Sequence, residues 1–450
     1  MLQLNIFCKN SLKKPQNNVK IIQNTHKIHQ IRIIMDKISA KNLLSQCEND
    51  LKEQFARLDD IALYNQQKVL DAFKTESIQA RHMFGTTGYG YDDIGRDTLC
   101  RLYADIFHAE SAIVSPNIVS GTHALALMLF GVLRPGDKLL AVSGMPYDTL
   151  TDVILADNKG SLKDFGVKFD KIDLKITEGL IPEFDYDAIK TALENEPIKA
   201  IFLARSRGYS LRQAISVESI EKLIAFVKKI SPKTLVLVDN CYGEFVEKIE
   251  PTDVGADLIA GSLIKNIGGG IAPTGGYVAG KTALVEQVSY RLTAPSLGME
   301  EGSYVYGYLP YYQGLFLAPS AVKNALKGSL LFAKVYTNLG FETLPRDNMH
   351  PYDIVTSIKL GSAQALIDFC GAIQEISPID SNVKPMPWDM PGYQDQVIMA
   401  AGAFVQGSSI ELSADSPIKE PYIVYVQGGL TYEHAYLAVL HTLECLDFTK

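Results

Sequence analysis

Thr234-Leu235-Val236-Leu237-Val238-Asp239 is the stretch that decides the fold, because four aliphatic residues in succession end in a carboxylate. A helical pattern, Val217–Lys229, precedes it, and a second apolar run, Leu258–Ser262, follows it. Strands that are almost entirely apolar are typical of sheets covered by helices on both faces. The same alternation predicts further strands at Ala112–Ser115, Lys138–Val142, Ala200–Ala204 and Gly276–Ala279, and helices at Thr122–Gly131 and Tyr186–Leu193. We therefore expect an α/β fold with a mostly parallel sheet.

The chain changes character on either side of this region. Apolar residues at helical spacing between Ile38 and Tyr64 predict a helical arm over residues 36–80. A glycine-dense loop, Met83–Gly95, then opens an α/β domain over residues 81–315. Residues 316–450 are expected to form a smaller C-terminal α+β domain, with helices at Ser320–Leu339, Ala363–Ile376 and Tyr432–Leu446 and strands at Tyr352–Leu360, Ser409–Ser413 and Tyr422–Gln427.

Residues 1–35 differ from the rest, since they contain six basic residues and no Asp or Glu. They have neither the apolar core nor the small-residue cleavage site of a secretory signal. An organellar transit peptide normally uses Arg and Ser more heavily. We expect either a disordered extension or residues translated from upstream of a true start at Met35.

Composition excludes several classes of protein. The 450 residues are 47% hydrophobic and 21% charged, which excludes a disordered or a collagen-like chain. The net charge of −8 gives no electrostatic reason to bind nucleic acid or anionic lipid. The longest apolar run, Ala124–Leu133, has ten residues, whereas a spanning helix needs about 20. Six scattered cysteines without a CxxC pair favour reduced thiols, so we expect a soluble, cytoplasmic protein.

Two strand-to-helix junctions carry residues that could bind a ligand. Ser120, Gly121 and Thr122 lie between a predicted strand and a predicted helix, where backbone N–H groups and the helix dipole favour a phosphate. The alternative is that Ser120 only caps the helix. Asp239 ends an apolar strand, and the carboxyl ends of such strands line the binding crevice of an α/β sheet. The alternative there is a carboxylate that caps a turn.

Lys265 is the third residue of interest, within Gly261-Ser262-Leu263-Ile264-Lys265-Asn266-Ile267-Gly268-Gly269-Gly270. A lysine among small and apolar residues is expected to be partly buried, and burial favours its neutral, nucleophilic form. The alternative is a surface lysine beside a flexible loop. The glycines break the GxGxxG pattern at its last position and follow a lysine, so a dinucleotide fingerprint is excluded.

Taken together, the three features are the parts that pyridoxal 5'-phosphate (PLP) requires. The loop at Gly121 would anchor the phosphate, and Asp239 would keep the pyridine nitrogen protonated. Lys265, 26 residues beyond Asp239, would form the covalent link to the cofactor. The sequence thus predicts a PLP site.

The residues also resemble a known family. Gly255-Ala256-Asp257-Leu258 followed by Ser262-x-x-Lys265 resembles the lysine segment of the cystathionine/methionine lyase class of fold-type I PLP enzymes. Three longer motifs resemble the methionine γ-lyase-like branch known as the aluminium-resistance protein family: Phe84-Gly85-Thr86-Thr87-Gly88-Tyr89-Gly90-Tyr91, Ala204-Arg205-Ser206-Arg207-Gly208-Tyr209 and Gln427-Gly428-Gly429-Leu430-Thr431-Tyr432-Glu433-His434. The resemblance covers about residues 40–448 and implies a fold-type I PLP-dependent architecture.

The resemblance implies roles for individual residues. Lys265 and Asp239 keep the roles given above, while Gly121, Thr122 and Ser262 would hold the phosphate together with Ser120. Tyr147 would stack on the cofactor ring and protonate the leaving thiol; a core aromatic is the alternative.

A second group of implied roles concerns the neighbouring subunit and the substrate. Tyr91 would reach the phosphate bound by the partner subunit. In the resembling lyases an arginine also makes this contact, but this chain has Asp93 at that position, and an aspartate would repel phosphate. Arg96 could make the contact instead. For the substrate carboxylate, Arg205, Arg207 and Lys419 are possible ligands, and we favour Arg207 and Lys419.

The predicted function is that of a PLP-dependent carbon–sulfur lyase acting on a sulfur-containing amino acid, as a homodimer or homotetramer with shared active sites. Elimination could be of the cystathionine β-lyase or the methionine γ-lyase type. The alternatives are another PLP reaction (aldolase, transaminase or replacement) or a catalytically idle PLP-binding protein with a stress role. The eight histidines form no HExxH motif or His/Cys cluster, so no metal site is expected.

Overall fold

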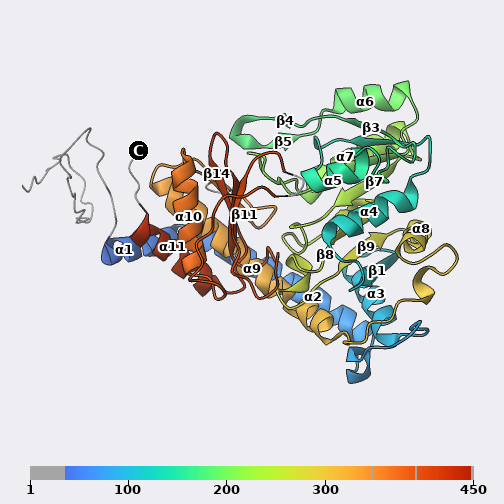
Figure 1. The fold of residues 1–450 in the computed structure, drawn as a ribbon, viewed down its shortest axis with the longest axis horizontal. Helices are drawn as coiled ribbons and strands as arrows, with labels where there is room; N and C mark the ends of the chain where they lie inside the picture. The colour runs from blue at the N-terminus through green and yellow to red at the C-terminus, as the bar shows by residue number, and fades with distance from the viewer. Residues whose placement is uncertain (1–35, 347–348, 391–392, 447–450) are drawn as a thin grey trace, which may run out of the picture.

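The structure is a computed structural model that describes residues 36–346, 349–390 and 393–446. Residues 1–35 lie outside the described residues, and with them the predicted extension or upstream start. The chain forms a large α/β unit and a smaller C-terminal unit beside it (Figure 1). A long helix, α9 (Leu309–Asn338), passes from one unit to the other.

The large unit is built on a seven-stranded sheet with the order β1-β9-β8-β7-β6-β2-β3. Its strands are β1 (Ser111–Ser115), β2 (Lys138–Ala141), β3 (Lys168–Lys171), β6 (Ala200–Ala204), β7 (Leu235–Asp239), β8 (Leu258–Ser262) and β9 (Gly276–Gly280). Strands β3, β2, β6, β7 and β8 pair in parallel, while β9 runs antiparallel to both β8 and β1. The sheet is therefore mostly parallel, as the sequence predicts.

Helices cover both faces of this sheet. Along β7, Val236 and Val238 belong to the core cluster that includes α3 and α7, whereas Leu237 belongs to the cluster on the opposite face with α4, α5 and α8. This alternation follows from the two-residue period of a strand and explains why the run is apolar throughout. The helices are α3 (Ile94–Ile106), α4 (Gly121–Val132), α5 (Asp148–Leu155), α6 (Tyr186–Asn195), α7 (Val217–Ile230) and α8 (Thr282–Leu292).

The C-terminal unit has a five-stranded antiparallel sheet with the order β10-β11-β14-β13-β12. Its strands are β10 (Thr343–Leu344), β11 (Val355–Lys359), β12 (Val397–Ala400), β13 (Ser413–Pro417) and β14 (Ile423–Gln427), and its helices are α10 (Ala363–Glu375) and α11 (Tyr432–Cys445). Two N-terminal helices, α1 (Lys37–Asp50) and α2 (Lys52–Thr75), pack along α9. The described elements also include a small hairpin, made of β4 (Lys175–Ile176) and β5 (Pro182–Glu183). They are completed by five short 3₁₀ turns: η1 (Ala80–Met83), η2 (Glu178–Leu180), η3 (Pro251–Val254), η4 (Asn266–Gly268) and η5 (Gly298–Glu300).

The structure differs from the sequence predictions at one strand and at one long helix. The strand expected at Ser409–Ser413 is wrong, because Glu411 folds the preceding loop by accepting hydrogen bonds from the backbone N–H groups of Phe404 and Val405. The strand begins at Ser413 instead. Helix α9 begins at Leu309, earlier than expected, and continues across Pro319. It thus runs through the predicted boundary at residues 315 and 316, and the division into domains stays a prediction.

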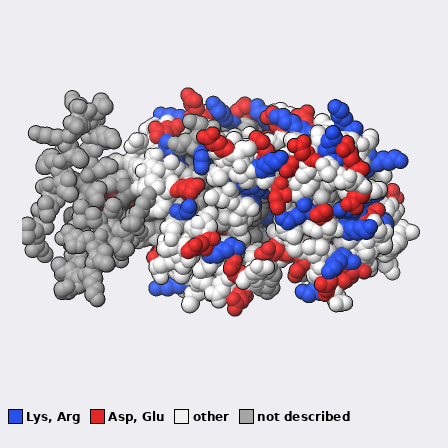
Figure 2. All heavy atoms as spheres, turned by 90° about the horizontal axis from the view of Figure 1, so that it is seen from above, with Lys and Arg blue, Asp and Glu red and all other residues white. Residues whose placement is uncertain are grey.

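Two further properties of the surface and the helices bear on partners. On the face drawn in Figure 2, basic and acidic side chains are interspersed rather than gathered by sign. Within the described ranges, no helix combines the length and the apolar character that crossing a membrane requires.

Candidate functional site

The site lies where the carboxyl ends of β7 and β8 meet the first turn of α4. A Cβ atom added at Gly121 would lie 3.1 Å from the Ser262 Cβ and 3.6 Å from the Cys241 Sγ. The absence of a side chain at Gly121 thus lets the start of α4 approach both strand ends closely. The structure brings Gly121, Ser262 and the loop after Asp239 together, as the sequence predicts for a phosphate-binding site.

The first turn of α4 has free donors for an anion. Ser120 is its N-cap, and the Ser120 hydroxyl accepts a hydrogen bond from the backbone N–H of His123 at 3.1 Å. The first N–H groups of any helix have no partner within the helix, which leaves those of Gly121 and Thr122 for a ligand. Capping and phosphate binding are therefore compatible here, and the helix dipole adds to the attraction of a negative group.

Tyr147 lies next to this turn, at the N-cap of α5. Its hydroxyl is 2.9 Å from the Thr122 Oγ1. Burial, followed by the negative charge of Asp239, raises the pKa of Tyr147 well above its ordinary value. The phenol is therefore protonated at neutral pH, which is the state that a proton donor needs.

Lys265 follows β8, and its side chain remains partly accessible. The Nζ atom lies 4.2 Å from the centre of the Tyr242 ring, a cation–π contact. Burial lowers the pKa of Lys265, but Cys241, Tyr242 and Asp239 act in the opposite direction, and the net pKa is raised well above its ordinary value. Burial thus favours the neutral amine, as expected, but the neighbouring groups outweigh it.

Asp239 is a buried carboxylate at the end of β7. Its Oδ1 accepts a hydrogen bond from the backbone N–H of Cys241 at 3.0 Å. Burial raises the pKa of Asp239, and Lys265 and the Cys241 N–H only partly oppose that rise. In the described part of the chain, no Lys, Arg or His nitrogen forms an ion pair with this carboxylate. A buried anion without an ion-pair partner suits a ligand that brings a cationic N–H.

These residues fit PLP. The Asp239 carboxylate, which lacks an ion-pair partner among the described residues, suits the ring nitrogen of PLP. The N-terminus of α4, which lies against two strand ends, suits its phosphate, and the accessible Lys265 suits its aldehyde. Lys265, Asp239, Gly121, Thr122 and Ser262 are the residues that would hold it, and each role stays a prediction. Tyr147 is close enough to Asp239 and Lys265 for both charges to act on its pKa.

Sequence reasoning missed Tyr242, whose ring contacts Lys265. Its backbone has a φ of 69°, a left-handed conformation that is uncommon for a bulky residue and is often found at functional sites. Tyr242 also packs, as Tyr209 does, against a small core cluster that includes Tyr425. Its position three residues after the strand-end Asp239 was the signal that could have identified it.

The two arginines of the Ala204–Tyr209 motif are engaged within the protein. Arg205 is fully buried, forms an ion pair with Glu247 and donates a hydrogen bond to the Asn240 Oδ1 at 3.0 Å. Arg207 is also buried, and its Nη2 donates to the Asp353 Oδ1 at 2.8 Å, which ties the large unit to the C-terminal one.

Lys419, the other predicted carboxylate ligand, pairs with Asp395 at 2.8 Å, and both side chains are exposed. The described contacts do not bring Arg207 or Lys419 to Lys265. Binding of a substrate carboxylate by either residue therefore stays a prediction.

The glycine-rich loop explains the unexpected Asp93. This residue is the N-cap of α3: its Oδ1 accepts from the Arg96 N–H at 3.0 Å, and its Oδ2 accepts from the Tyr308 hydroxyl at 2.9 Å. Arg96 is buried, with its guanidinium bonded to Asp97 and to the Gly90 carbonyl. Within its own chain Arg96 is thus buried and hydrogen-bonded to the loop, which leaves Tyr91 as the exposed member of the predicted phosphate contact.

The glycines after Lys265 serve packing. The backbone at Gly269 has a φ of 58°, and a Cβ atom there would lie 2.3 Å from the Gly314 carbonyl oxygen. No side chain fits between η4 and α9 at this point. The alternative of a flexible surface loop is therefore wrong, and the glycines hold the lysine segment against α9.

A buried carboxylate lies beside the lysine segment and gives a testable pH dependence. The Glu244 side chain is fully buried, its Oε1 accepts from the Tyr277 hydroxyl at 2.8 Å, and its Oε2 has no partner among the described residues. The backbone carbonyl oxygen of Glu244 accepts a hydrogen bond from the Asn266 side-chain amide at 3.0 Å. Burial raises the pKa of Glu244 from 4.5 to about 8.

Glu244→Gln should therefore change how stability depends on pH. Between pH 4.5 and about 8 the folded chain binds a proton that the unfolded chain has lost, so this group makes stability fall as the pH rises through that interval. Glutamine imitates the protonated acid and does not titrate. The variant should match wild type near pH 5 and exceed it by about 1–3 kcal/mol at pH 9. Urea unfolding of the cofactor-free proteins at several pH values measures this; a difference that is constant with pH would contradict it.

Comparison with known proteins now bears on this geometry. The family model described as methionine gamma-lyase matches residues 40–447. Protein YnbB of Bacillus subtilis, whose function is uncharacterized, is 47% identical over 409 residues, which cover 90% of this chain and 96% of that protein. The structure of a carbon–sulfur lyase involved in aluminum resistance from Clostridium novyi is 50% identical, with a TM-score of 0.86 and coverage of 90% and 95%.

A structure from Listeria innocua, named a candidate cystathionine beta-lyase involved in aluminum resistance, is 47% identical with a TM-score of 0.87 and covers 90% of this chain and 99% of its own. The PLP-dependent protein YhfS from Escherichia coli shares only the fold, at 16% identity and a TM-score of 0.57 over 85% of this chain and 95% of its own. The fold is thus that of the fold-type I PLP-dependent enzymes, and the family implies PLP as the cofactor. By the family model, which spans nine-tenths of its length, the chain belongs to the methionine gamma-lyase family.

Proposed function

We propose that this protein is a PLP-dependent carbon–sulfur lyase that acts on a sulfur-containing amino acid. The observation that carries the proposal is the proximity of three groups that act on one another's pKa: the Lys265 amine, the buried Asp239 carboxylate without an ion pair, and the Tyr147 phenol. Elimination of a thiol requires a base for the Cα proton, an anion that supports an electron sink, and an acid for the leaving sulfur. The family and the carbon–sulfur lyase from Clostridium novyi support the same reaction class.

PLP, when bound, accepts the electron pair left at Cα into its protonated ring. The chain's own residues do the rest. The amides of Gly121 and Thr122 and the hydroxyl of Ser262 would hold the phosphate, and Asp239 would hold the proton of the ring nitrogen. Lys265 would hold the cofactor covalently, and its free amine would remove the Cα proton as a general base.

The departure of the thiol depends on Tyr147. Thr122 Oγ1, 2.9 Å from the Tyr147 hydroxyl, fixes the orientation of the phenol. The raised pKa of Tyr147 keeps its proton available for the leaving sulfur. The remaining product then breaks down in water to ammonia and a 2-oxo acid, so each turnover yields one thiol, one ammonia and one 2-oxo acid.

Assays of the purified holoenzyme test this proposal. With cystathionine, methionine, cysteine or homocysteine as substrate, we expect equal amounts of thiol and 2-oxo acid from at least one of them. Exchange of an amino group with an added 2-oxo acid, without thiol release, would indicate a transaminase instead. Spectral changes of bound cofactor without turnover of any of these amino acids would identify a binding protein.

A second copy of the chain is the proposed partner, through the glycine-rich loop. Residues 84–91 and 301–306 lie against each other: the Gly302 N–H donates to the Tyr89 carbonyl at 2.9 Å, and the Tyr91 hydroxyl donates to the Glu301 Oε1 at 3.2 Å. Together they expose a group of large apolar side chains, Phe84, Tyr89, Tyr91, Val305 and Tyr306, the last of them 85% exposed. Such a patch is costly in water and favours burial in a symmetric interface.

Sharing of the active site predicts complementation between two inactive variants. Tyr91→Ala should impair binding of the partner's phosphate, and Lys265→Ala should remove the base from its own subunit. After subunit exchange, half of the dimers are mixed and each contains one intact site, so activity should recover to about a quarter of wild type. Activity is measured after mixing, with exchange confirmed by native mass spectrometry. No recovery despite exchange would place Tyr91 outside the partner's site.

A further inference from the structure

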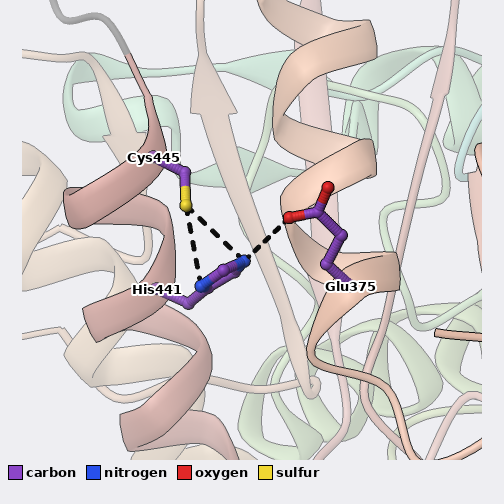
Figure 3. Close-up of side chains that lie close together, drawn as sticks. All are labelled: Glu375, His441 and Cys445. Atoms are coloured by element: carbon purple, nitrogen blue, oxygen red, sulfur yellow. Dashed lines mark hydrogen bonds and ion pairs between the residues drawn. The ribbon is translucent and has the colours of Figure 1, made fainter. Parts of the chain in front are cut away.

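We propose that Glu375, His441 and Cys445 form a surface site for a borderline-soft divalent cation, best represented by Zn²⁺. Figure 3 shows the three side chains gathered where α10 and α11 end next to each other. The site lies in the C-terminal unit, apart from the elements that carry Lys265 and Asp239 (Figure 1). The prediction that the histidines form no His/Cys cluster overlooked that His441 and Cys445, four residues apart, share one face of a helix.

The distances suit coordination. The His441 Nε2 lies 3.1 Å from the Glu375 Oε2, and the Cys445 Sγ lies 3.6 Å from each nitrogen of the His441 ring. In a tetrahedral zinc site with bonds of about 2.0–2.3 Å, neighbouring N and O ligands are about 3.3 Å apart and N and S ligands about 3.6 Å apart. The N–O and N–S distances therefore match those of such a site, and all three ligand atoms lie within 4.8 Å of one another.

The ligand set selects the class of ion. One imidazole nitrogen, one thiol sulfur and one carboxylate oxygen are the donors that Zn²⁺ uses, and a water molecule would complete four-fold coordination. Hard ions such as Mg²⁺ prefer oxygen ligands only. Cys445 is also the exposed cysteine among the five that the structure describes, the other four being buried.

Binding would require two small changes that the geometry permits. The cation takes the place of the proton between the His441 Nε2 and Glu375, and the Cys445 thiol loses its proton to water. In Figure 3 the sulfur lies over the face of the imidazole ring. Rotation of the exposed Cys445 side chain about its Cα–Cβ bond would bring the sulfur toward the Nε2 edge.

The surroundings favour positive charge. Glu375 is the last residue of α10 and Cys445 is the last residue of α11, so both ligands lie on C-terminal turns, whose carbonyl groups carry partial negative charge. Neither helix has a basic residue in its last turn. The carboxylates of Glu375 and Glu444 add negative charge beside Cys445, which also attracts a cation.

Titration of the full-length holoenzyme with Zn²⁺, and with Co²⁺ as a spectroscopic probe, tests the site. We expect one ion per chain at this position, a near-ultraviolet thiolate-to-Co²⁺ absorption band, and a higher Tm with Zn²⁺ than with Mg²⁺. Cys445→Ser should abolish the absorption band, and both Cys445→Ser and His441→Ala should weaken Zn²⁺ binding about tenfold or more.

Two control variants separate this site from other metal-binding groups. Glu433→Gln removes an exposed acid at the opposite end of α11 and should leave Zn²⁺ affinity unchanged. Cys8→Ser removes a thiol outside the described residues and should leave the Co²⁺ band intact. Absence of Zn²⁺ binding, or equal affinity in wild type, Cys445→Ser and His441→Ala, would overturn the proposal and identify the three groups as a hydrogen-bonded surface cluster.

Discussion

Lys265→Ala is expected to reduce kcat/KM for thiol release by about 10³-fold or more, the largest effect of any single change proposed for this protein. The amine has two roles in the proposed reaction, since it holds the cofactor covalently and then removes the Cα proton. Alanine supplies neither a covalent link nor a base. The Tyr242 ring and the first turn of α4 remain in place, so the variant should still bind PLP, but only reversibly.

A matched lysine controls for the loss of a positive charge. Lys222 is exposed on α7 and pairs with Glu218, four residues earlier on the same helix. Lys222→Ala should keep full activity, because exposed pairs of this kind contribute little to stability and none to the site. Borohydride reduction of the wild-type holoenzyme, followed by peptide mass spectrometry, should fix the cofactor at Lys265. A reduced cofactor attached to another lysine would contradict the assignment.

The fold was predictable where the apolar pattern of a single strand or helix shows which of its faces are buried. The run Leu235–Val238 is apolar because helices cover both faces of its strand, and one strand of this kind implies the layered architecture. The antiparallel direction of β9 was not predictable, since a buried strand is apolar whichever way it runs. The strand at Ser413–Pro417 was also missed, because its small and polar residues, Asp415 among them, follow no apolar alternation.

The candidate site divides in a similar way. Lys265, Asp239 and Gly121 could be proposed from sequence because each lies at or just beyond the end of a strand or helix that the local pattern reveals. Arg207 could not be interpreted in that way, since its partner, Asp353, lies 146 residues further along the chain. A charge looks like a possible substrate ligand until tertiary structure supplies its counter-ion.

Asp93 illustrates the opposite case. In the resemblance it stands where an arginine is expected, yet its local pattern is that of a helix N-cap.

The cluster of Glu375, His441 and Cys445 could be predicted only in part from the sequence. The four-residue spacing of His441 and Cys445 lies in the sequence, whereas Glu375 joins them only through the packing of α10 on α11.

Asp239→Asn provides the second large effect, an expected loss of about 10²–10³-fold in kcat with the cofactor still bound. Asparagine has nearly the same shape, and its side-chain oxygen can still accept the hydrogen bond from the Cys241 N–H, so the loop should keep its conformation. The variant lacks the buried negative charge of Asp239, and this charge is expected to keep the ring nitrogen of PLP protonated. Without that proton, the electron pair from Cα has no favourable destination.

Asp257 is the matched control for the Asp239 prediction, because it is also a buried carboxylate and directly precedes the neighbouring strand β8. It forms ion pairs with Lys228 and Lys281 and accepts the Val236 N–H at 2.7 Å, so its charge serves the fold. Asp257→Asn should lower the free energy of unfolding while leaving kcat per bound cofactor unchanged, the reverse of the pattern for Asp239→Asn. Denaturant unfolding and steady-state assays of both variants, normalised to bound cofactor, make the comparison. If Asp239→Asn instead lost stability and kept its turnover, Asp239 would be a turn cap like any other, and the electron sink would need a different anion.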